Sequence, residues 1–242
     1  MENPQRAASI NDRGVVAAEY SDERRLMARV RVFDEFLEGP DCLEVTFQAI
    51  IEAAPRDVLE VGAGWGDLAV RIRDTVGARV TATDLSARMT DLLRQRQLDT
   101  VQADAQQLPF PDGSFDLVVA NSMLYHVPDP TTAIRQFARV MRPTSRLVAT
   151  TYGRNHLREV WSLVGDTVVE RSFGLENGRS LLETAFARVE CRRGQGEVTF
   201  PNADEVRTYV SSTVTRAHLA DLVPDFDGPL VAHSDFAVFV AT

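Results

Sequence analysis

The chain has 242 residues, of which 44% are hydrophobic and 25% are charged, and this balance is typical of a soluble protein with one well-packed core. Its formal net charge of -9 argues against a nucleic-acid partner, because phosphate backbones require a basic surface. All 26 basic residues are arginine, which excludes chemistry that needs a lysine, such as a Schiff base or a P-loop phosphate contact.

The first part of the chain carries no pattern of a folded element. Residues 1–18 are polar and unpatterned, so we expect them to be disordered. They lack the apolar core of a signal peptide, and no apolar run approaches the ~20 residues that span a bilayer. Cys42 and Cys191 are far apart and form no metal-type spacing. The sequence therefore predicts free thiols, a cytoplasmic location, no membrane partner and no metal.

Residues 19–55 are predicted to form two helices, because apolar residues recur at helical spacing on both sides of Pro40. From residue 57 onwards, apolar strands alternate with helices. The predicted strands are 57–61, 79–83, 100–103, 115–120 and 146–151. The predicted helices between them are 67–75, 86–96 with Ser86 as N-cap, and 131–141.

After residue 152 the pattern is less regular. Helices are predicted over 154–171, 178–185 and 203–221, and strands over 186–192 and 234–241. Nearly continuous apolar strands that alternate with helices indicate a parallel sheet covered on both faces. Right-handed crossovers then give a doubly wound α/β fold with a mostly parallel, seven-stranded sheet. The last strand, which follows an inserted helical segment, predicts an antiparallel edge.

A glycine-rich loop, Gly62-Ala63-Gly64-Trp65-Gly66, follows the strand 57–61 and opens the next helix. Doubly wound folds bind ligands at this position, and glycines there allow a tight turn and close backbone approach. A dinucleotide fingerprint would place its third glycine at position 67, which is Asp67 in this chain. An NAD(P)-dependent oxidoreductase remains an alternative that the sequence matches incompletely.

Four motifs in chain order resemble those of class I methyltransferases that use S-adenosyl-L-methionine (SAM), in the small-molecule branch called type 11. They are EVGAGWG at 60–66, ATDLS at 82–86, ADAQQLPFPDGSFDLVV at 103–119, and LYHVPDP at 124–130 with RVMRP at 139–143. The resemblance covers 58–152 and extends to 19–55. The family commonly has RPGG where this chain has RPTS at 142–145, which puts the geometry of that turn in doubt.

The resemblance implies a Rossmann-like class I methyltransferase fold in a single domain over 1–242, with SAM as its cofactor. Within it, 19–55 would form a helical lid and 56–152 the SAM-binding core. Residues 153–242 would supply a C-terminal helical insertion on the substrate side and the last strands.

The resemblance also assigns residues to the cofactor. Asp84 would accept hydrogen bonds from both ribose hydroxyls, Asp104 would accept from the adenine amine, and Tyr20 would reach the carboxylate end of SAM. The complete set is Tyr20, Glu60, Gly62, Ala63, Gly64, Asp84, Leu85, Asp104, Ala105, Gln106, Asn121 and Met123.

Methyl transfer from a sulfonium is an in-line displacement, so the protein mainly aligns the nucleophile and excludes water. A base is needed only when the acceptor must lose a proton. His126 is the candidate base, because it follows the strand 115–120 and the pKa of histidine suits proton transfer. A structural role for His126 is the alternative. Tyr125 and Tyr152 are candidates for the wall of an acceptor pocket.

The expected activity is methyl transfer to the N, O or C atom of a small-molecule acceptor, with natural-product biosynthesis as the candidate context. The strand 115–120 is followed by NSML rather than by the NPPY type used on adenine or glutamine nitrogens. Together with the acidic charge, this argues against a DNA methyltransferase. A non-catalytic SAM-binding module remains a further alternative, because the sequence contains no obvious catalytic dyad.

Overall fold

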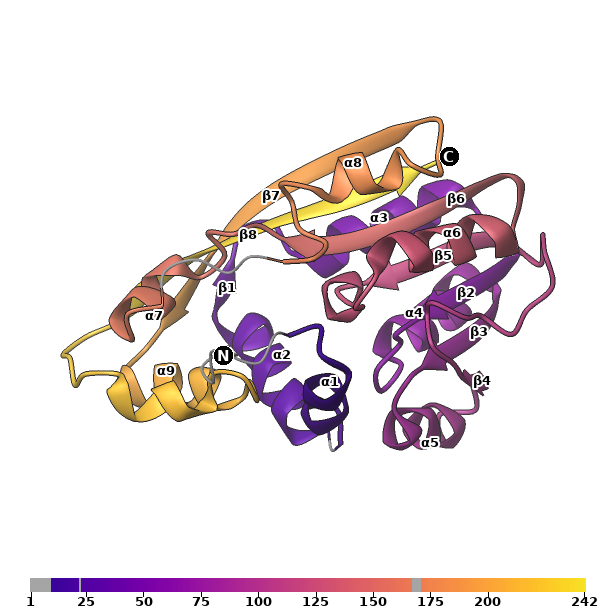
Figure 1. The fold of residues 1–242 in the computed structure, drawn as a ribbon. Helices are drawn as coiled ribbons and strands as arrows, with labels where there is room; N and C mark the ends of the chain where they lie inside the picture. Colours follow the sequence, from indigo (N-terminus) through magenta and orange to yellow (C-terminus); the bar gives the residue numbers. More distant parts are fainter. Residues whose placement is uncertain (1–9, 22, 167–170) are drawn as a thin grey trace, which may run out of the picture.

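The computed structural model describes residues 10–21, 23–166 and 171–242 (Figure 1), so residues 1–9 of the segment expected to be disordered lie outside the described residues. An eight-stranded sheet has the order β1-β7-β8-β6-β5-β2-β3-β4. Its strands are β1 Leu37–Glu38, β2 Asp57–Val61, β3 Arg79–Asp84, β4 Asp99–Gln102, β5 Phe115–Asn121, β6 Met141–Tyr152, β7 Val189–Phe200 and β8 Leu230–Ala241.

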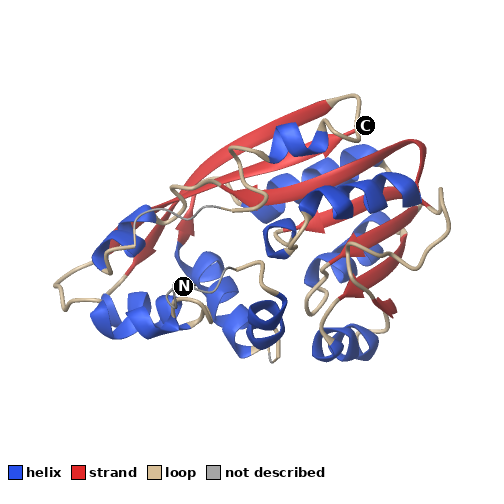
Figure 2. Ribbon diagram, in the orientation of Figure 1, coloured by secondary structure: helices blue, strands red, loops and turns tan. Residues whose placement is uncertain are grey.

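Helices lie on both faces of this sheet (Figure 2). The α-helices are α1 Arg13–Glu19, α2 Arg24–Phe36, α3 Cys42–Ala53, α4 Asp67–Val76, α5 Ala87–Gln95, α6 Pro130–Val140, α7 Arg158–Leu163, α8 Gly178–Leu182 and α9 Ala203–Ser211. Two short 3-10 helices are η1 Leu124–His126 and η2 Ala217–Leu222.

The sheet confirms the predicted doubly wound α/β class. The strands from β6 through β5, β2 and β3 to β4 pair in parallel, and β8 and β7 add the expected antiparallel edge. All seven predicted strands are present. The eighth is β1, which pairs with β7 through Leu37↔Val198 and Glu38↔Glu197. Two residues are too few to leave a period-two pattern in the sequence.

Alternating side chains of the central strands build a separate core on each face of the sheet. Leu117 and Val119 of β5 pack in the cluster that holds α3 and α4, while Val118 and Ala120 pack in the cluster that holds α6 and α8. Burial on both faces explains why these strands are almost continuously apolar.

The N-terminal segment is more ordered than the sequence indicated. Residues 13–18, expected to be disordered, belong to α1, and the Asp12 carboxylate accepts hydrogen bonds from the backbone N–H of Gly14 and Val15. A capping aspartate supplies acceptors to the unpaired first turn of a helix. The prediction of disorder is therefore wrong for these residues. Helix α1 is only seven residues long, and its apolar residues 15–18 are consecutive, so they do not show the spacing of an apolar stripe.

Several elements in the C-terminal part differ in extent from the prediction. The segment expected to be helical over 203–221 forms α9 and η2, with residues 212–216 between them, and the last strand begins at Leu230. The helix expected over 154–171 is α7, which starts after Leu157 at φ +53° and is followed by Gly165 at φ +73°; residues 167–170 lie outside the described residues. The strand expected over 186–192 is the longer β7. Gly194 in β7 pairs with Phe236 of β8, and a Cβ at Gly194 would lie 2.2 Å from the ring of Phe236. Glycine disfavours strands in general, but here it makes room for an aromatic ring across the ladder.

The outer half of the β7–β8 ribbon extends past the rest of the sheet and carries a group of helices. β8 pairs with β6 only from Phe236 onwards, so its residues 230–235 pair with β7 alone. A third hydrophobic cluster forms there, which contains Val32 of α2, Trp161 of α7 and Tyr209 of α9. We call α1, α2, α7 and α9 the cover; they lie to the left of and below the sheet in Figure 1.

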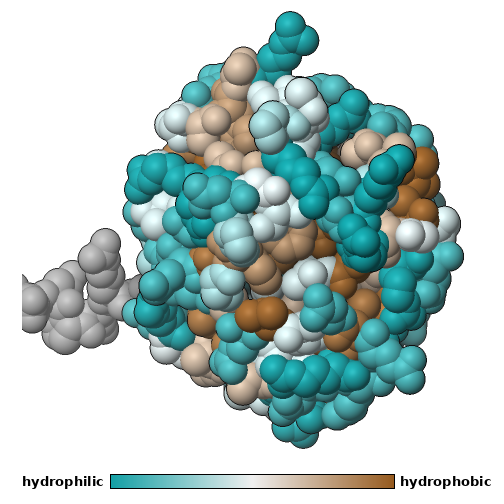
Figure 3. Space-filling model, turned by 90° about the vertical axis from the view of Figure 1, so that its right-hand side faces the viewer, coloured by the Kyte–Doolittle hydropathy of each residue, from teal (hydrophilic) through white to brown (hydrophobic). Residues whose placement is uncertain are grey.

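Hydrophilic side chains surround smaller hydrophobic areas on the face shown in Figure 3. Within the described part of the chain, no helix combines the length and the apolar character that a bilayer crossing requires.

The turn before the central stretch of β6 keeps a glycine-like conformation without a glycine. Thr144 stands at the third position of RPTS, where the family pattern has glycine, and adopts φ +68° on an exposed surface. A β-branched residue is strained in this region of backbone conformation.

We predict that Thr144→Gly raises the free energy of unfolding by about 1 kcal/mol, measured by chemical denaturation. Thr144→Ala retains a Cβ and should gain less; a glycine variant less stable than the wild type would contradict the prediction.

Candidate functional site

The loops that follow β2 and β5 leave the sheet as neighbours, because these two parallel strands pair with each other. The chain continues from β2 to β3 on one side and from β5 to β6 on the other, so this is the switch point of the fold. The cover contributes to the same region, and a cavity of about 650 Å³ is enclosed by residues of both parts.

Every residue that the sequence assigned to the site lines this cavity. The structure therefore brings the predicted set together from the cover and from the ends of four strands with the loops that follow them, while the role of each residue toward a ligand stays a prediction. The set is Tyr20, Glu60, Gly62, Ala63, Gly64, Asp84, Leu85, Asp104, Ala105, Gln106, Asn121, Met123 and His126.

The first glycine of the loop allows the loop that follows β2 to contact the loop that follows β5. Gly62 adopts φ +69°, and a Cβ on it would lie 2.8 Å from Cβ of Met123, which follows β5. Gly64 also has a positive φ, +57°, and its N–H donates to Oδ2 of Asp84 over 3.0 Å. The glycines thus fix the loop against two of the predicted cofactor residues.

The third glycine, which stands one position earlier than in a dinucleotide fingerprint, has a packing role. Gly66 adopts φ +91° at the start of α4, and a Cβ there would lie 2.6 Å from Cδ2 of Leu93 in α5. The next residue, Asp67, accepts hydrogen bonds from the Trp65 indole and from the Arg96 guanidinium. This acidic helix start is therefore neutralised by the protein itself.

The Asp84 carboxylate is positioned by backbone donors on both oxygens. Oδ2 accepts from Gly64 N–H, and Oδ1 accepts from Ser86 N–H over 2.9 Å. Burial raises the pKa of Asp84 above its ordinary value, although the backbone hydrogen bonds oppose this rise. Each carboxylate oxygen keeps a second lone pair, so Asp84 can accept from two adjacent hydroxyl groups.

Glu60 is a buried acid that lacks a counter-charge. Its side chain lies beneath the glycine loop at 2% exposure, and Oε2 has no hydrogen-bond partner among the described residues. Burial, and then the neighbouring charges of Asp84 and Asp67, raise the pKa of Glu60 to about 8. Such a group favours a cationic or hydrogen-donating ligand. Within the described ranges, no group of three or more His, Cys, Asp or Glu side chains is arranged to hold a metal ion.

Asp104 has a partner that the sequence did not indicate. Its Oδ1 accepts from the backbone N–H of Gln106 over 2.8 Å, and its Oδ2 forms an ion pair with Nη2 of Arg13 at 2.5 Å. Arg13 belongs to the segment expected to be disordered. The structure thus connects the first helix of the cover to the predicted adenine acceptor.

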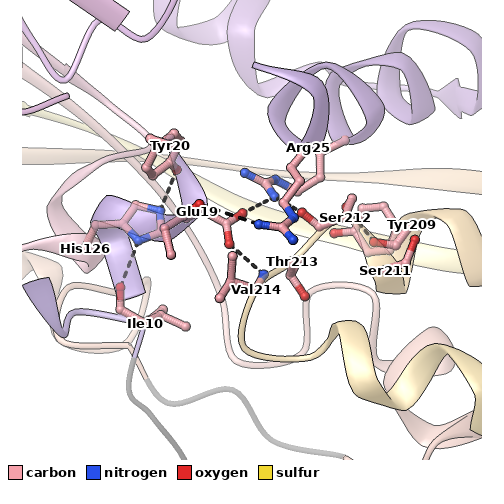
Figure 4. A network of polar contacts seen from close by, with 12 residues as sticks. Ile10, Glu19, Tyr20, Arg25, His126, Tyr209, Ser211, Ser212, Thr213 and Val214 are labelled. Atoms are coloured by element: carbon pink, nitrogen blue, oxygen red, sulfur yellow. Dashed lines mark hydrogen bonds and ion pairs between the residues drawn. The ribbon is translucent and has the colours of Figure 1, made fainter. Parts of the chain in front are cut away.

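Both ring nitrogens of His126 are hydrogen bonded to the N-terminal part of the chain (Figure 4). Nδ1 lies 3.0 Å from the carbonyl oxygen of Ile10, which can only accept, so Nδ1 carries the proton and Nε2 accepts from the Tyr20 hydroxyl over 2.9 Å. Burial lowers the pKa of His126 to about 4. In this arrangement the ring is neutral near pH 7.

A buried ion pair holds the two ends of the cover together. The Arg29 guanidinium donates to the Glu19 carboxylate and to the carbonyl oxygen of Ser212, 2.5 Å away. The other Glu19 oxygen accepts from the backbone N–H of Val214 over 2.7 Å, as Figure 4 shows. Helices α1 and α2 are thereby connected to the segment that follows α9.

Aromatic rings line the part of the cavity between α2, β6 and the C-terminal insertion. His156 stacks on Phe33 with ring centroids 5.8 Å apart, and its ring centroid lies 4.1 Å from that of Tyr152. His156 is 5% exposed, so it is a buried packing residue. Tyr125 and Tyr152 were expected in this region from the sequence. Arg171 was not, because the part of the chain that contains it has no family motif.

Comparison with known proteins finds methyltransferases over the part of the chain that carries the resemblance to class I methyltransferases. The family model described as "Methyltransferase domain" matches residues 59–149. The chain is 34% identical over 201 residues to a malonyl-[acyl-carrier protein] O-methyltransferase of Halorhodospira halophila, covering 76% of this chain and 65% of that protein. It is 35% identical over 130 residues to a ubiquinone biosynthesis O-methyltransferase of Xanthomonas oryzae, covering 51% and 54%. The chain thus spans less than two thirds of the length of these curated relatives.

A similar fold occurs in solved structures. A phosphoethanolamine N-methyltransferase 2 of Haemonchus contortus, solved with S-adenosylhomocysteine, matches with a TM-score of 0.64 at 16% identity. The match covers 97% of this chain and 60% of that one. At this identity the similarity concerns the fold.

The buried Glu60 predicts an unusual dependence of stability on pH. Its pKa is about 8 in the folded protein against an ordinary 4.5, so the folded state binds an extra proton between these values and loses stability as pH rises through them. We predict that the free energy of unfolding of the wild type falls relative to Glu60→Gln by about 1.4 kcal/mol per pH unit in this window. Chemical denaturation at several pH values measures this difference, and parallel curves for the two proteins would refute it.

Proposed function

Since this chain belongs to the class I SAM-dependent methyltransferases of the type 11 branch, whose cofactor is SAM, we propose that it transfers the methyl group of SAM to a small-molecule acceptor. The observation that carries the proposal is the convergence of the family's motif residues on one cavity at the switch point of the sheet. The N, O or C nature of the acceptor atom and a place in natural-product biosynthesis are part of the proposal.

The residues of the cavity fit this cofactor. The Oε2 atom of Glu60, which is buried and has no partner among the described residues, matches a ligand with an ammonium group. Asp84 has acceptor capacity for the ribose hydroxyls, and Asp104 for the adenine amine. When bound, SAM supplies a methyl group activated by a positively charged sulfur.

The chain itself contributes enclosure and alignment. The cover closes over the strand ends through Arg13–Asp104, through Tyr20–His126, and through the Ser86 hydroxyl, which donates to the Tyr20 carbonyl over 2.8 Å. Enclosure removes water and holds an acceptor in one orientation, and proximity of this kind can lower a barrier by roughly 7–11 kcal/mol. Most of the catalytic effect is therefore assigned to the closed cavity.

His126 is proposed as a positioning residue of the cover in place of the general base considered from the sequence. A base that works near neutrality needs a pKa near the working pH and a free lone pair. The pKa of His126 is lowered to about 4, and its Nε2 lone pair accepts from Tyr20. This assignment favours acceptors whose nucleophilic atom needs no early deprotonation.

Asp84→Asn tests the proposed cofactor site. The change removes the charge of an acceptor while keeping its shape, so we expect the dissociation constant of S-adenosylhomocysteine to rise about tenfold to a hundredfold, since hydrogen bonds to a charged group contribute about 1.5–3 kcal/mol. Isothermal titration calorimetry measures this constant directly.

Asp99→Asn is the matched control for that experiment. Asp99 is the first residue of β4, so it lies at the end of that strand away from Asp104, and it accepts a hydrogen bond from the Thr81 hydroxyl over 3.1 Å. Its replacement should leave S-adenosylhomocysteine binding within about twofold of the wild type. No binding to the wild type, or equal affinities for the wild type and Asp84→Asn, would overturn the proposed function.

The positioning role of His126 has a spectroscopic signature. Because burial lowers its pKa to about 4, we expect nuclear magnetic resonance of the ring nitrogens to report a neutral imidazole with the proton on Nδ1 throughout pH 6–8. Tyr20→Phe removes the donor to Nε2, which stabilises the neutral ring, and should therefore raise the pKa of His126. A wild-type ring that titrates between pH 6 and 8 would instead support a general base.

A further inference from the structure

Arg171 is a buried cation whose guanidinium reaches the aromatic part of the cavity. Its guanidinium carbon lies 5.7 Å from the centre of the Tyr125 ring and 6.0 Å from that of Tyr152. One of its nitrogens, Nη1, donates to the carbonyl oxygen of Gly153 over 2.8 Å. Nε and Nη2 have no hydrogen-bond partner among the described residues, so Arg171 keeps donors for a ligand.

The backbone that follows Arg171 is anchored by contacts of the next two residues. Phe173, two residues on, is fully buried in the core, and its carbonyl oxygen accepts from the Thr151 hydroxyl of β6 over 2.8 Å. The Ser172 hydroxyl donates to the carbonyl oxygen of Tyr125 over 3.2 Å. Arg171 is therefore held in place before any ligand arrives, which lowers the entropic cost of binding.

Arg171 differs from the other arginines of the cavity in having no carboxylate partner within the described part of the chain. Arg13 pairs with Asp104, Arg29 pairs with Glu19, and Arg216 pairs with Asp166. Among the described residues no acid forms an ion pair with Arg171, and burial lowers its pKa while an arginine still remains charged at neutral pH. A buried charge without a partner destabilises a protein, so such groups are candidates for ligand binding.

Resting on the proposed function, we infer that the methyl acceptor carries a carboxylate group, and that Arg171 binds this carboxylate in the aromatic part of the cavity. The guanidinium fork matches the two oxygens of a carboxylate in shape and charge. The rings of Tyr125 and Tyr152 beside it provide apolar contact for the body of the acceptor.

Charge balance favours a monoanionic carboxylate over a phosphate dianion. One unmatched guanidinium neutralises one negative charge. The next arginine in this part of the cavity, Arg216, is already neutralised by Asp166 through a 2.5 Å contact and lies over the Trp161 ring. A second negative charge on the ligand would stay buried without a partner, which costs several kcal/mol.

Matched ligand pairs test the inference. Acetate, benzoate and 4-phenylbutyrate are each compared with the corresponding amide, which has nearly the same shape but no charge, in the presence of saturating S-adenosylhomocysteine. Calorimetry and thermal unfolding should give at least one pair in which the carboxylate binds tenfold or more tightly than its amide. Equal affinities within every pair, or no binding of any carboxylate, overturn the inference.

Variants at two arginines separate a specific contact from a general positive field. Arg171→Gln should abolish the preference for the carboxylate, while Arg171→Lys, which keeps the charge but loses the fork, should retain part of it. Arg216→Gln removes an equal charge that also lines the cavity, and it should keep the preference. Loss of the preference in Arg216→Gln to the same extent as in Arg171→Gln would overturn the assignment to Arg171.

A ligand-free measurement guards against variants that only perturb folding. Removal of an unmatched buried charge should stabilise the protein, so Arg171→Met is expected to unfold at a higher denaturant concentration than the wild type. Arg29→Met, which leaves the buried Glu19 without its partner, should unfold at a lower concentration. A destabilised Arg171→Met would mean that the protein itself already compensates Arg171, contrary to the inference.

Failure of the inference can be distinguished from failure of the proposed function. If S-adenosylhomocysteine binds normally but each carboxylate binds no more tightly than its amide, the inference about Arg171 fails while the proposed methyltransferase function stands. If the protein does not bind S-adenosylhomocysteine but still prefers carboxylates to their amides, the proposed methyltransferase function fails while the anion-binding site at Arg171 stands.

Discussion

Burial of ionisable side chains between the strand ends and the cover is the constraint on which the rest of the structure depends. The outer half of the β7–β8 ribbon packs against α2, α7 and α9, and residues of these helices line the cavity together with the strand ends. Charges placed there must be matched, because low-dielectric surroundings make an isolated charge expensive. Glu19 and Arg29 are matched by each other and hold the cover together. Glu60 and Arg171 have no partner of opposite charge among the described residues. A ligand can supply a cation or hydrogen-bond donor to the carboxyl group and an anion to the guanidinium.

The SAM-binding half of the molecule could be predicted because its signals are local. The strand at Asp57–Val61 is a short apolar run, Ser86 caps α5 through a hydroxyl that accepts from Met89 N–H, and the glycine loop lies between a strand and a helix. Parallel strands place their carboxyl ends at one edge of the sheet. The order of the strands in the sequence was therefore enough to predict that Asp84 and Asn121 line the same cavity. Even the departure at Thr144 left the turn intact, since the threonine adopts the conformation that a glycine would take.

The cover and the part of the chain after residue 152 could not be predicted in the same way, because their features depend on contacts between distant segments. Arg13 meets Asp104 across 91 positions, and Arg29 reaches the Ser212 carbonyl across 183. No periodicity or spacing indicates such pairs. The length of β7 was underestimated because Gly194 looks unfavourable in a strand until Phe236 is seen to cover it. The unmatched charge of Arg171 becomes visible only when every other arginine of the cavity has been paired.

A crystal structure of the ternary complex with S-adenosylhomocysteine and the tightest-binding carboxylate of the panel would show directly whether ligands pair with Glu60 and Arg171. We expect the ammonium group of S-adenosylhomocysteine to lie within hydrogen-bond distance of Glu60, and the carboxylate to form a bidentate ion pair with Arg171. Tyr20 and His126 should remain hydrogen bonded beneath the closed cover. A complex in which Glu60 still lacks a cationic partner, or in which the carboxylate binds away from Arg171, would contradict the inference that ligands pair with these two buried groups.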